Sequence, residues 1–149
     1  MLTTHGQNLR QYDVYGRSIG IRRGDRYLIV NPFFHSFGYK AGWLAAFLQG
    51  AVALPHAVFD AETVLRRIER ERITVMPGPP ALFQSLLAAD YRAHDLASLR
   101  LATTGSASVP VELVHRMKND LGIDVVLTAY GLTESSGVVT ISSPDDDFE

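Results

Sequence analysis

Short runs of apolar residues alternate with longer segments of helical periodicity, and this alternation restricts the fold more than any other feature of the chain. The runs are apolar, partly β-branched and short enough for buried strands; they cover residues 26–30, 51–54, 73–76, 99–103 and 124–127. Strands that alternate with helices predict βαβ units. We therefore predict an α/β fold, in which a parallel sheet is flanked by helices on both faces.

The segments between these runs carry signals for helix starts and ends. Ser36 and Asp60 each have a side-chain oxygen that can cap the helix that follows, and Gly122 suits the position just past a helix end. The predicted helices cover approximately residues 7–15, 36–49, 61–70, 81–89 and 110–121. We expect the charged face of the third helix to be solvated.

These elements divide the 149 residues into three parts. Residues 1–25 lead into the fold, residues 26–141 hold the βα repeats, and residues 142–149 form an acidic tail. The length suffices for one domain with a sizeable core. We expect the tail to be frayed and solvated rather than to form a metal site.

The composition excludes several classes of protein. A formal net charge of -2 argues against the basic surface of a nucleic-acid-binding protein. The chain has no cysteine, which excludes disulfides, zinc–thiolate sites and a cysteine nucleophile. Neither a secretory signal nor a stretch of the ~20 apolar residues that span a bilayer is visible. We therefore expect a cytoplasmic protein with no nucleic-acid partner and no transmembrane segment.

Polar residues gather where three of the predicted strands end. Residues 33–38 (FFHSFG) follow the first strand, residues 104–108 (TGSAS) the fourth, and residues 129–136 (AYGLTESS) the fifth. In open α/β sheets, ligands bind beyond the carboxyl ends of the strands. Three such exits at one sheet edge predict a ligand-binding cleft.

The last of these stretches has the residue types that a nucleotide needs. Tyr130 offers a flat face for a base, and Gly131 lets the backbone approach a ligand closely. Thr133 can donate a hydrogen bond to a phosphate oxygen, and Glu134 is the kind of oxygen ligand that Mg²⁺ takes. The alternatives are an ordinary strand exit with solvated side chains and, for His35, a purely structural histidine.

Other common motifs do not occur. The five histidines lack the i,i+4 spacing of a helical metal pair, and no Gly-x-Ser-x-Gly elbow of a serine hydrolase is present. The glycines fit neither the Gly-x-Gly-x-x-Gly pattern nor the P-loop. Nucleotide binding of those two kinds is therefore not expected.

Three motifs in register resemble the adenylate-forming superfamily of AMP-binding enzymes. They are NPFFHSFG at residues 31–38, TGSA at residues 104–107 and YGLTE at residues 130–134, and residues 1–9 are similar to the segment that directly follows the family's phosphate loop. Within the superfamily the chain resembles the acyl-CoA synthetases, or fatty-acid–CoA ligases. Residues 31–42, 75–86 and 144–147 are similar to actinobacterial enzymes that join steroid-derived propanoates to CoA.

The resemblance implies an ATP-dependent carboxylic acid–CoA ligase of fatty acid metabolism or steroid catabolism. In this family a carboxylate attacks the α-phosphate of ATP, giving an acyl-adenylate and pyrophosphate, and the thiol of CoA then displaces AMP. ATP, Mg²⁺, CoA and a small carboxylic acid are thus the implied ligands. The acyl group stays open.

The resemblance also implies roles for single residues. The nucleotide pocket would comprise Gly105, Ser106, Ala107, Tyr130, Gly131 and Thr133. Thr133 would hydrogen-bond the α-phosphate and Glu134 would bind Mg²⁺, which makes both catalytic. His35, the third catalytic residue, would lie beside the acyl carboxylate and the phosphate, and the acyl group would meet Phe34, His35 and Gly131.

Several functional parts of the family are missing from this sequence: the phosphate loop, the ribose-binding aspartate, the hinge and the lysine of the C-terminal domain. We therefore expect a fragment of the N-terminal domain, or a truncated gene product, that does not adenylate a carboxylic acid alone. We also expect it to self-associate through surfaces that the rest of the enzyme normally covers.

Two other functions remain open. The first is a non-catalytic nucleotide-binding or assembly module built from a partial domain. The second is an amino-acid adenylation domain, in which an aspartate follows the phenylalanine of the first motif to hold the substrate amine. His35 occupies that position here, which disfavours an amino acid.

Overall fold

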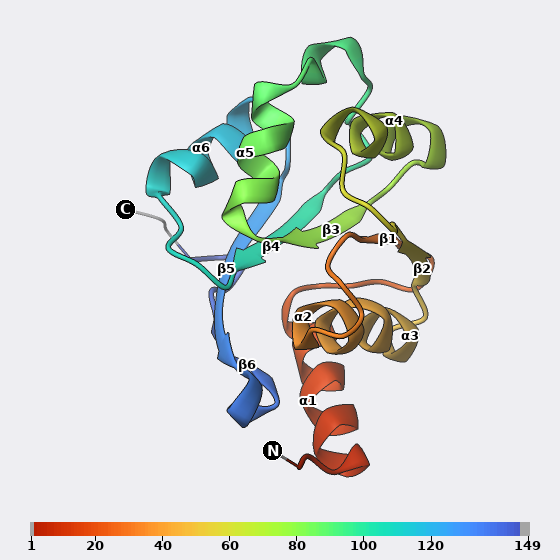
Figure 1. The fold of residues 1–149 in the computed structure, drawn as a ribbon, viewed down its shortest axis with the longest axis vertical. Coiled ribbons are helices and arrows are strands. Elements are labelled where there is room, and N and C mark those ends of the chain that lie inside the picture. Colours follow the sequence, from red (N-terminus) through yellow and green to blue (C-terminus); the bar gives the residue numbers. More distant parts are fainter. Residues whose placement is uncertain (1, 147–149) are drawn as a thin grey trace.

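A six-stranded sheet runs through the middle of the structure, with its strands in the order β2-β1-β3-β4-β5-β6 (Figure 1). The computed structural model describes residues 2–146. The strands are β1 (Arg26–Ile29), β2 (Val52–Pro55), β3 (Val75–Gly78), β4 (Leu101–Gly105), β5 (Val125–Leu132) and β6 (Gly137–Ile141). The first five pair in parallel, and β6 pairs antiparallel with β5 at the edge.

Helices cover both faces of this sheet (Figure 1). One face carries α4 (Ala61–Glu71), α5 (Pro80–Ala88), the 3-10 turn η2 (Tyr91–Ala93) and α6 (Val111–Asn119). The other carries α1 (His5–Ser18), α2 (Ser36–Gly38), the π-helical turn η1 (Tyr39–Leu44) and α3 (Ala45–Leu48). Within residues 2–146, no helix has both the length and the apolar character needed to cross a membrane. The predicted α/β fold with helices on both faces is confirmed.

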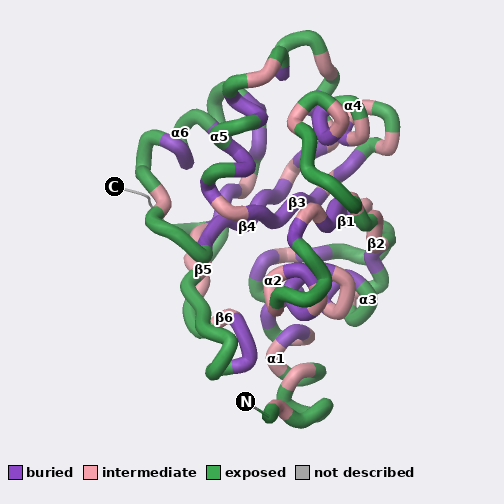
Figure 2. Tube along the Cα trace, in the orientation of Figure 1, coloured by how far each residue is buried: buried purple, intermediate pink, exposed green. Residues whose placement is uncertain are grey.

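Successive strand residues alternate between two separate cores. Leu28, Met76, Ala102 and Val126 pack with the apolar side chains of α4, α5 and α6. Their neighbours in the strands face α1 and α3; these are Tyr27, Ile29, Val75, Leu101 and Leu127. Because both faces are covered, the strands form continuous apolar runs, as the sequence predicted. Figure 2 shows the central strands as buried, whereas β5 changes from buried to exposed along its length.

Helix caps were predicted with mixed success. Asp60 caps α4, and its Oδ1 accepts a hydrogen bond from the Thr63 amide at 2.8 Å. Ser36 was the wrong residue for the cap of the next predicted helix. His35 takes that position instead, and its Nδ1 accepts from the Phe37 amide at 3.1 Å. Gly122 has a positive φ of 69° but lies two residues beyond the α6 cap at Asp120.

Two elements differ from the sequence-based expectation. The helix predicted over residues 36–49 is interrupted by a π-helical turn with a kink at Gly42 (φ -83°, ψ -105°). Strand β5 continues to Leu132 instead of ending near Leu127, because β6 returns and pairs with its outer part. A Cβ on Gly131 would collide with the carbonyl oxygen of Gly137, so the glycine is needed for this pairing. The sheet is thus parallel except at β6.

A buried polar cluster lies at the end of the sheet where the parallel strands begin. Asp25 is 7% exposed and pairs with Arg100. Its carboxylate also accepts from the Arg22 amide at 2.7 Å and from the Thr74 hydroxyl at 2.8 Å. Arg100 donates in addition to the Gly20 carbonyl at 2.9 Å. The cluster therefore ties the residues that precede β1, β3 and β4 to the end of α1.

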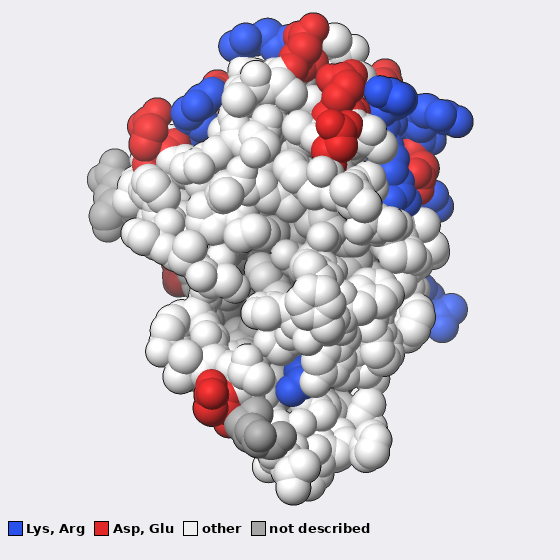
Figure 3. Space-filling view, in the orientation of Figure 1, with Lys and Arg blue, Asp and Glu red and all other residues white. Residues whose placement is uncertain are grey.

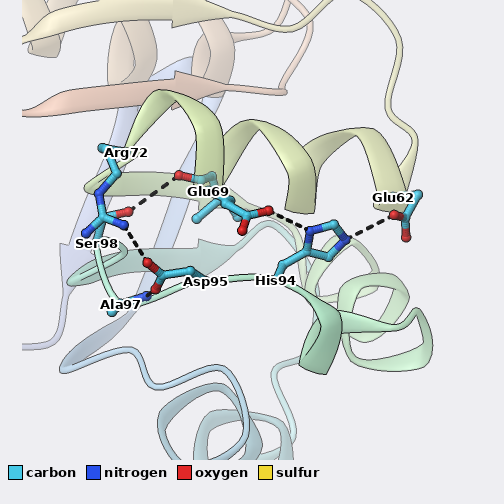
Figure 4. A network of polar contacts seen from close by, with 8 residues as sticks. Glu62, Glu69, Arg72, His94, Asp95, Ala97 and Ser98 are labelled. Atoms are coloured by element: carbon cyan, nitrogen blue, oxygen red, sulfur yellow. Dashed lines mark hydrogen bonds and ion pairs between the residues drawn. The ribbon is translucent and has the colours of Figure 1, made fainter.

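A second polar network fastens α4 to the segment after η2 (Figure 4). The imidazole of His94 lies between two carboxylates of α4, with Nδ1 at 3.1 Å from Glu69 and Nε2 at 3.0 Å from Glu62. Arg72, at the end of α4, pairs with Asp95 at 2.7 Å. The hydrogen bond to Glu69 is the largest cause that raises the pKa of His94 above its usual 6.5.

The described part of the predicted tail begins against the sheet, where the Ser142 amide donates to the Thr128 carbonyl at 3.0 Å. Residues 142–146 of the predicted tail include a turn in which the Ser143 amide donates to Asp146 Oδ2 at 2.6 Å. Met1 and the rest of the tail, residues 147–149, lie outside the described residues.

Candidate ligand-binding site

A cavity of about 290 Å³ lies where β4 and β5 end and meet α1 and α2. Its volume is near the lower limit of typical ligand sites, ~300 Å³. Figure 3 shows a hollow on this side of the molecule, below the sheet, while charged groups gather at the other end, around α4. The lining residues are Tyr12, His35, Ser36, Phe37, Ala41, Gly105, Ser106, Ala129, Tyr130, Gly131, Leu132, Thr133, Glu134, Gly137 and Val138.

Most of the residues singled out in the sequence lie in this lining. They come from the three predicted strand exits and are His35, Gly105, Ser106, Tyr130, Gly131, Thr133 and Glu134. Phe34 and Ala107 are not among the lining residues, and Phe34 is 91% exposed. Three segments that lie far apart along the chain are thus brought together at one end of the sheet.

The hairpin of β5 and β6 presents the residues predicted to bind nucleotide. Tyr130 lies on the exposed half of β5 with 58% of its surface accessible. Thr133 and Glu134 are exposed in the 3-10 turn η3 (Thr133–Ser135) at the tip of the hairpin. The Ser135 hydroxyl stabilises this turn by donating to the Leu132 carbonyl at 2.9 Å. The hairpin therefore presents an aromatic ring, a hydroxyl and a carboxylate within five residues of one another.

Ser106 follows β4 and has a positive φ of 67°. Residues other than glycine rarely adopt this conformation, and it is frequent at functional sites. His35, across the cavity, is exposed at the start of α2. Because its Nδ1 accepts from the Phe37 amide, the proton of the neutral ring is on Nε2, which can donate to a ligand.

Sequence reasoning missed residues that support the hairpin, namely Tyr12, Lys40 and Gln11, whose Nε2 donates to the carbonyls of Ser135 and Val138. The Tyr12 hydroxyl donates to the Ser136 carbonyl at 2.9 Å and accepts from the Val138 amide at 3.4 Å. Burial raises the pKa of Tyr12, so the hydroxyl keeps its proton. Lys40 is 2% exposed, and its Nζ donates to the same Ser136 carbonyl at 3.2 Å. The one signal in the sequence was a lysine placed directly before the longest apolar segment.

The charge of the cavity limits the metals that it could hold. Among residues 2–146, Glu134 is the one carboxylate in the lining, and no lysine or arginine of this part of the chain lines the cavity. Among residues 2–146, no three histidine, cysteine or acidic side chains are grouped closely enough to hold a metal by themselves. Mg²⁺ commonly binds one or two carboxylates together with phosphate oxygens and water. Glu134 therefore fits a magnesium ion that arrives with a phosphate ligand, but not a magnesium site made of protein alone.

Comparison with known proteins gives one family along the whole chain. The model of the family described as AMP-binding enzyme matches residues 1–149. The chain is 53% identical over 148 residues to a (7a-methyl-1,5-dioxo-octahydro-1H-inden-4-yl)propanoyl:CoA ligase of Mycobacterium tuberculosis. It is 49% identical over 148 residues to a ligase of the same name from Rhodococcus jostii. These matches cover 99% of this chain but only 29% and 28% of those proteins, so the chain spans less than a third of their length.

A solved structure gives the same result for the fold. The anthranilate CoA ligase AuaEII in complex with anthranoyl-AMP superimposes with a TM-score of 0.88 at 28% sequence identity. The match covers 97% of this chain and 28% of that one.

Proposed function

This chain belongs to the AMP-binding enzyme family, and we propose that it forms part of the active site of an ATP-dependent carboxylic acid–CoA ligase. The resemblance to acyl-CoA synthetases that the three motifs indicated is confirmed by the family match and by the two actinobacterial ligases. The observation that carries the proposal is that His35, Ser106 and Glu134, from three distant stretches, line one cavity.

The hairpin and the end of β4 suit an adenine nucleotide. The exposed ring of Tyr130 would stack against the base, and the backbone at Gly105 and Ser106 would border it. The Thr133 hydroxyl would donate to an oxygen of the α-phosphate. Ala107 lies outside the lining, so its proposed contact rests on the resemblance alone.

Glu134 would hold Mg²⁺ together with oxygens of the bound phosphates. When bound, the ion would neutralise charge that develops on the phosphates during the transfer. Glu134 is exposed at the tip of the hairpin, where a ligand carrying the ion can reach it from solvent.

The proposed reaction joins an acid to CoA in two steps. In the first, a carboxylate oxygen forms a bond to the α-phosphorus of ATP, and the bond from that phosphorus to pyrophosphate breaks. In the second, the thiol sulfur of CoA bonds to the acyl carbon, its proton leaves, and AMP departs as the acyl C–O bond breaks. His35 would donate from Nε2 to an oxygen of the carboxylate or the phosphate and so orient the two anions.

The substrate we propose is a propanoate carried on fused rings, as in the name of the two actinobacterial ligases. Phe34, with 91% of its surface exposed, would contact the acyl group together with segments of the longer enzyme. ATP and CoA as co-substrates suit a cytoplasmic enzyme, and steroid catabolism is the process in which this chemistry belongs.

Titration of the chain with AMP in a calorimeter tests the nucleotide site. We expect binding that is weakened about tenfold by Tyr130→Ala, since base–aromatic stacking is worth about 1–3 kcal/mol. Phe47→Ala is the matched control, because Phe47 is also exposed (61%) but does not line the cavity. The absence of AMP binding in the wild-type chain would contradict the proposal.

A second candidate is a module that binds nucleotide without turning it over. The cavity lining favours it for the chain on its own, because no lysine or arginine there can stabilise the charge of the transfer. AMP binding without release of pyrophosphate from ATP and acid would support this second candidate. Pyrophosphate release by the 149-residue chain would exclude it.

A further inference from the structure

Lys40 is buried in a way that its residue type rarely tolerates. Only 2% of its surface is exposed, and no carboxylate within residues 2–146 forms an ion pair with its ammonium group. Removing an ammonium ion from water is costly unless its hydrogen bonds are replaced. A residue that serves packing alone would be better replaced by an apolar side chain of similar length. Packing alone therefore does not explain why a charged residue is buried at this position.

The contacts of Lys40 point to the hairpin that lines the cavity. Its Nζ donates to the carbonyl oxygen of Ser136 at 3.2 Å, and the Tyr12 hydroxyl donates to the same oxygen at 2.9 Å. The two donors come from different elements, the π-helical turn η1 and helix α1. One carbonyl oxygen separates Lys40 from Tyr12, which is itself a lining residue of the cavity.

The hairpin needs such an anchor because of its own geometry. Its outer strand β6 pairs with β5 alone, and an isolated two-stranded hairpin is only marginally stable. Ser136 and Gly137 lie in the left-handed region, with φ of 70° and 118°. Ser136 directly follows the turn that carries Thr133 and Glu134. Holding the Ser136 carbonyl therefore fixes the position of the two groups that would meet the phosphates.

A charged donor suits this task better than a neutral one. Hydrogen bonds from an ammonium group are shorter and stronger than those from neutral groups. The cavity lining contains the carboxylate of Glu134 and no cation, so a nearby ammonium also offsets that negative charge and favours an anionic ligand. In addition, Lys40 lies in a π-helical turn, and such turns are frequent at functional sites.

We infer that Lys40 is a positioning residue of the proposed ligase site: with Tyr12 it holds the Ser136 carbonyl and thereby keeps Thr133 and Glu134 in place for an anionic ligand. The inference rests on the proposed function, because a positioned hairpin matters only if the cavity binds a phosphate.

The test compares four variants of the chain. Lys40→Met removes the charge but keeps the length, Lys40→Arg keeps the charge, and Tyr12→Phe removes the other donor. Lys118→Met makes the same chemical change on the exposed surface of α6 and serves as the control. Two quantities are measured for each: amide hydrogen exchange along the chain, and the dissociation constant for AMP.

We expect Lys40→Met to speed amide exchange at residues 131–138 by about tenfold, because one charged hydrogen bond is lost. The amides of β3 and β4 should keep the wild-type exchange rates. AMP should bind about tenfold more weakly. Lys40→Arg should restore much of the slow hairpin exchange and of the AMP affinity, and Tyr12→Phe should show a smaller effect of the same kind. Lys118→Met should leave the exchange of residues 131–138 and the AMP affinity unchanged, because α6 contributes no residue to the cavity lining.

The possible failures can be told apart. Unchanged hairpin exchange in Lys40→Met overturns the inference, and so does an increase of equal size throughout the chain, which would mark Lys40 as merely structural. Faster hairpin exchange with unchanged AMP affinity overturns its positioning role. If the wild-type chain binds no AMP, the proposed function fails, while the exchange data still decide whether the anchor exists. Should Lys40→Met fail to fold, Tyr12→Phe carries the same comparison.

Discussion

Gly137 is a residue of the site whose replacement the structure tolerates poorly. Its φ of 118° is unfavourable for any residue with a Cβ, and that Cβ would collide with the Tyr12 hydroxyl. We predict that Gly137→Ala lowers the free energy of unfolding by about 2–3 kcal/mol, since strain and displacement of a buried hydrogen-bonded group act together. Urea denaturation measures this.

Gly122→Ala provides the control for that substitution. Gly122 also has a positive φ, of 69°, but nothing lies within 4 Å of the added Cβ. Backbone strain alone should cost about 1 kcal/mol there. Equal losses at the two glycines would show that Tyr12 does not constrain the hairpin.

Glu134 offers a test of the proposed metal contact, again at the scale of one residue. Glu134→Gln keeps the shape of an exposed side chain but removes the charge that Mg²⁺ needs. We predict weaker binding of ATP in the presence of Mg²⁺, by about tenfold, and unchanged binding of AMP in its absence. Calorimetry with both ligands measures the difference. Glu112→Gln, on the exposed side of α6, should change neither.

At the scale of elements, the cluster around Asp25 holds the strand starts together. Asp25 is buried, pairs with Arg100 and accepts two further hydrogen bonds, from the Arg22 amide and the Thr74 hydroxyl, which lie before β1 and β3. We predict that Asp25→Ala destabilises the fold by about 3–5 kcal/mol, because it leaves the guanidinium group of Arg100 unpaired. Asp120→Ala breaks an exposed ion pair with Arg116 and should cost at most about 1 kcal/mol. Thermal unfolding compares the two.

His94 makes the attachment of α4 dependent on pH. Only a protonated imidazole can donate from both ring nitrogens, to Glu69 and to Glu62. Its pKa is raised in the folded state, so its contribution to stability is fully present below about 6.5 and is lost as the pH rises through the folded pKa.

We therefore predict that His94→Gln destabilises the chain more at about pH 5.5 than at about pH 8.5. Denaturant midpoints measured for wild type and variant across this range give the difference directly. His115→Gln, on the exposed surface of α6, is the matched control. A gap between wild type and His94→Gln that stays constant with pH would mean that the imidazole is not charged in the folded state.

The sequence predicted the elements well where a local pattern decides them. The five parallel strands and the helices between them follow from apolar runs and amphipathic spacing, and Asp60 marks the start of α4 by its own side chain. The outer half of β5 and all of β6 were missed, because Tyr130 to Leu132 are exposed and owe their strand conformation to pairing with β6. The kink in η1 likewise depends on packing against the sheet, which no local pattern reports.

The same distinction applies to the site. Residues that would touch a ligand, such as His35 and Glu134, stand out in the sequence because polar groups follow apolar strands. Tyr12 and Lys40 act through hydrogen bonds to the backbone of Ser136, a residue about a hundred positions away. Their sequence neighbours carry no sign of that partner, so only the fold identifies them.

At the scale of the whole molecule, large apolar side chains remain exposed on one flank. The edge strand β2 pairs only with β1, and Val52 in it is 45% exposed. Phe47 and Val58 nearby in the sequence are 61% and 78% exposed. An uncovered edge strand with apolar neighbours promotes association between chains.

We predict that the chain self-associates at high concentration and that Val52→Lys reduces this, because a charge on an edge strand opposes strand pairing. Light scattering over a concentration series measures it. Val111→Lys places the same charge on α6, where Val111 is 55% exposed, and should leave association unchanged. A monodisperse wild-type monomer at all concentrations would contradict the prediction.

The two-sided construction of the sheet has a practical consequence. The lining of the cavity draws on strand ends, the hairpin and the layer of α1 and α2, and includes no residue of α4, α5 or α6. The cavity thus faces one helical layer only, and the helices of the other layer pack against the opposite face of the sheet. A fluorophore or an affinity tag attached to α4 or α6 could report on the molecule without obstructing its ligand.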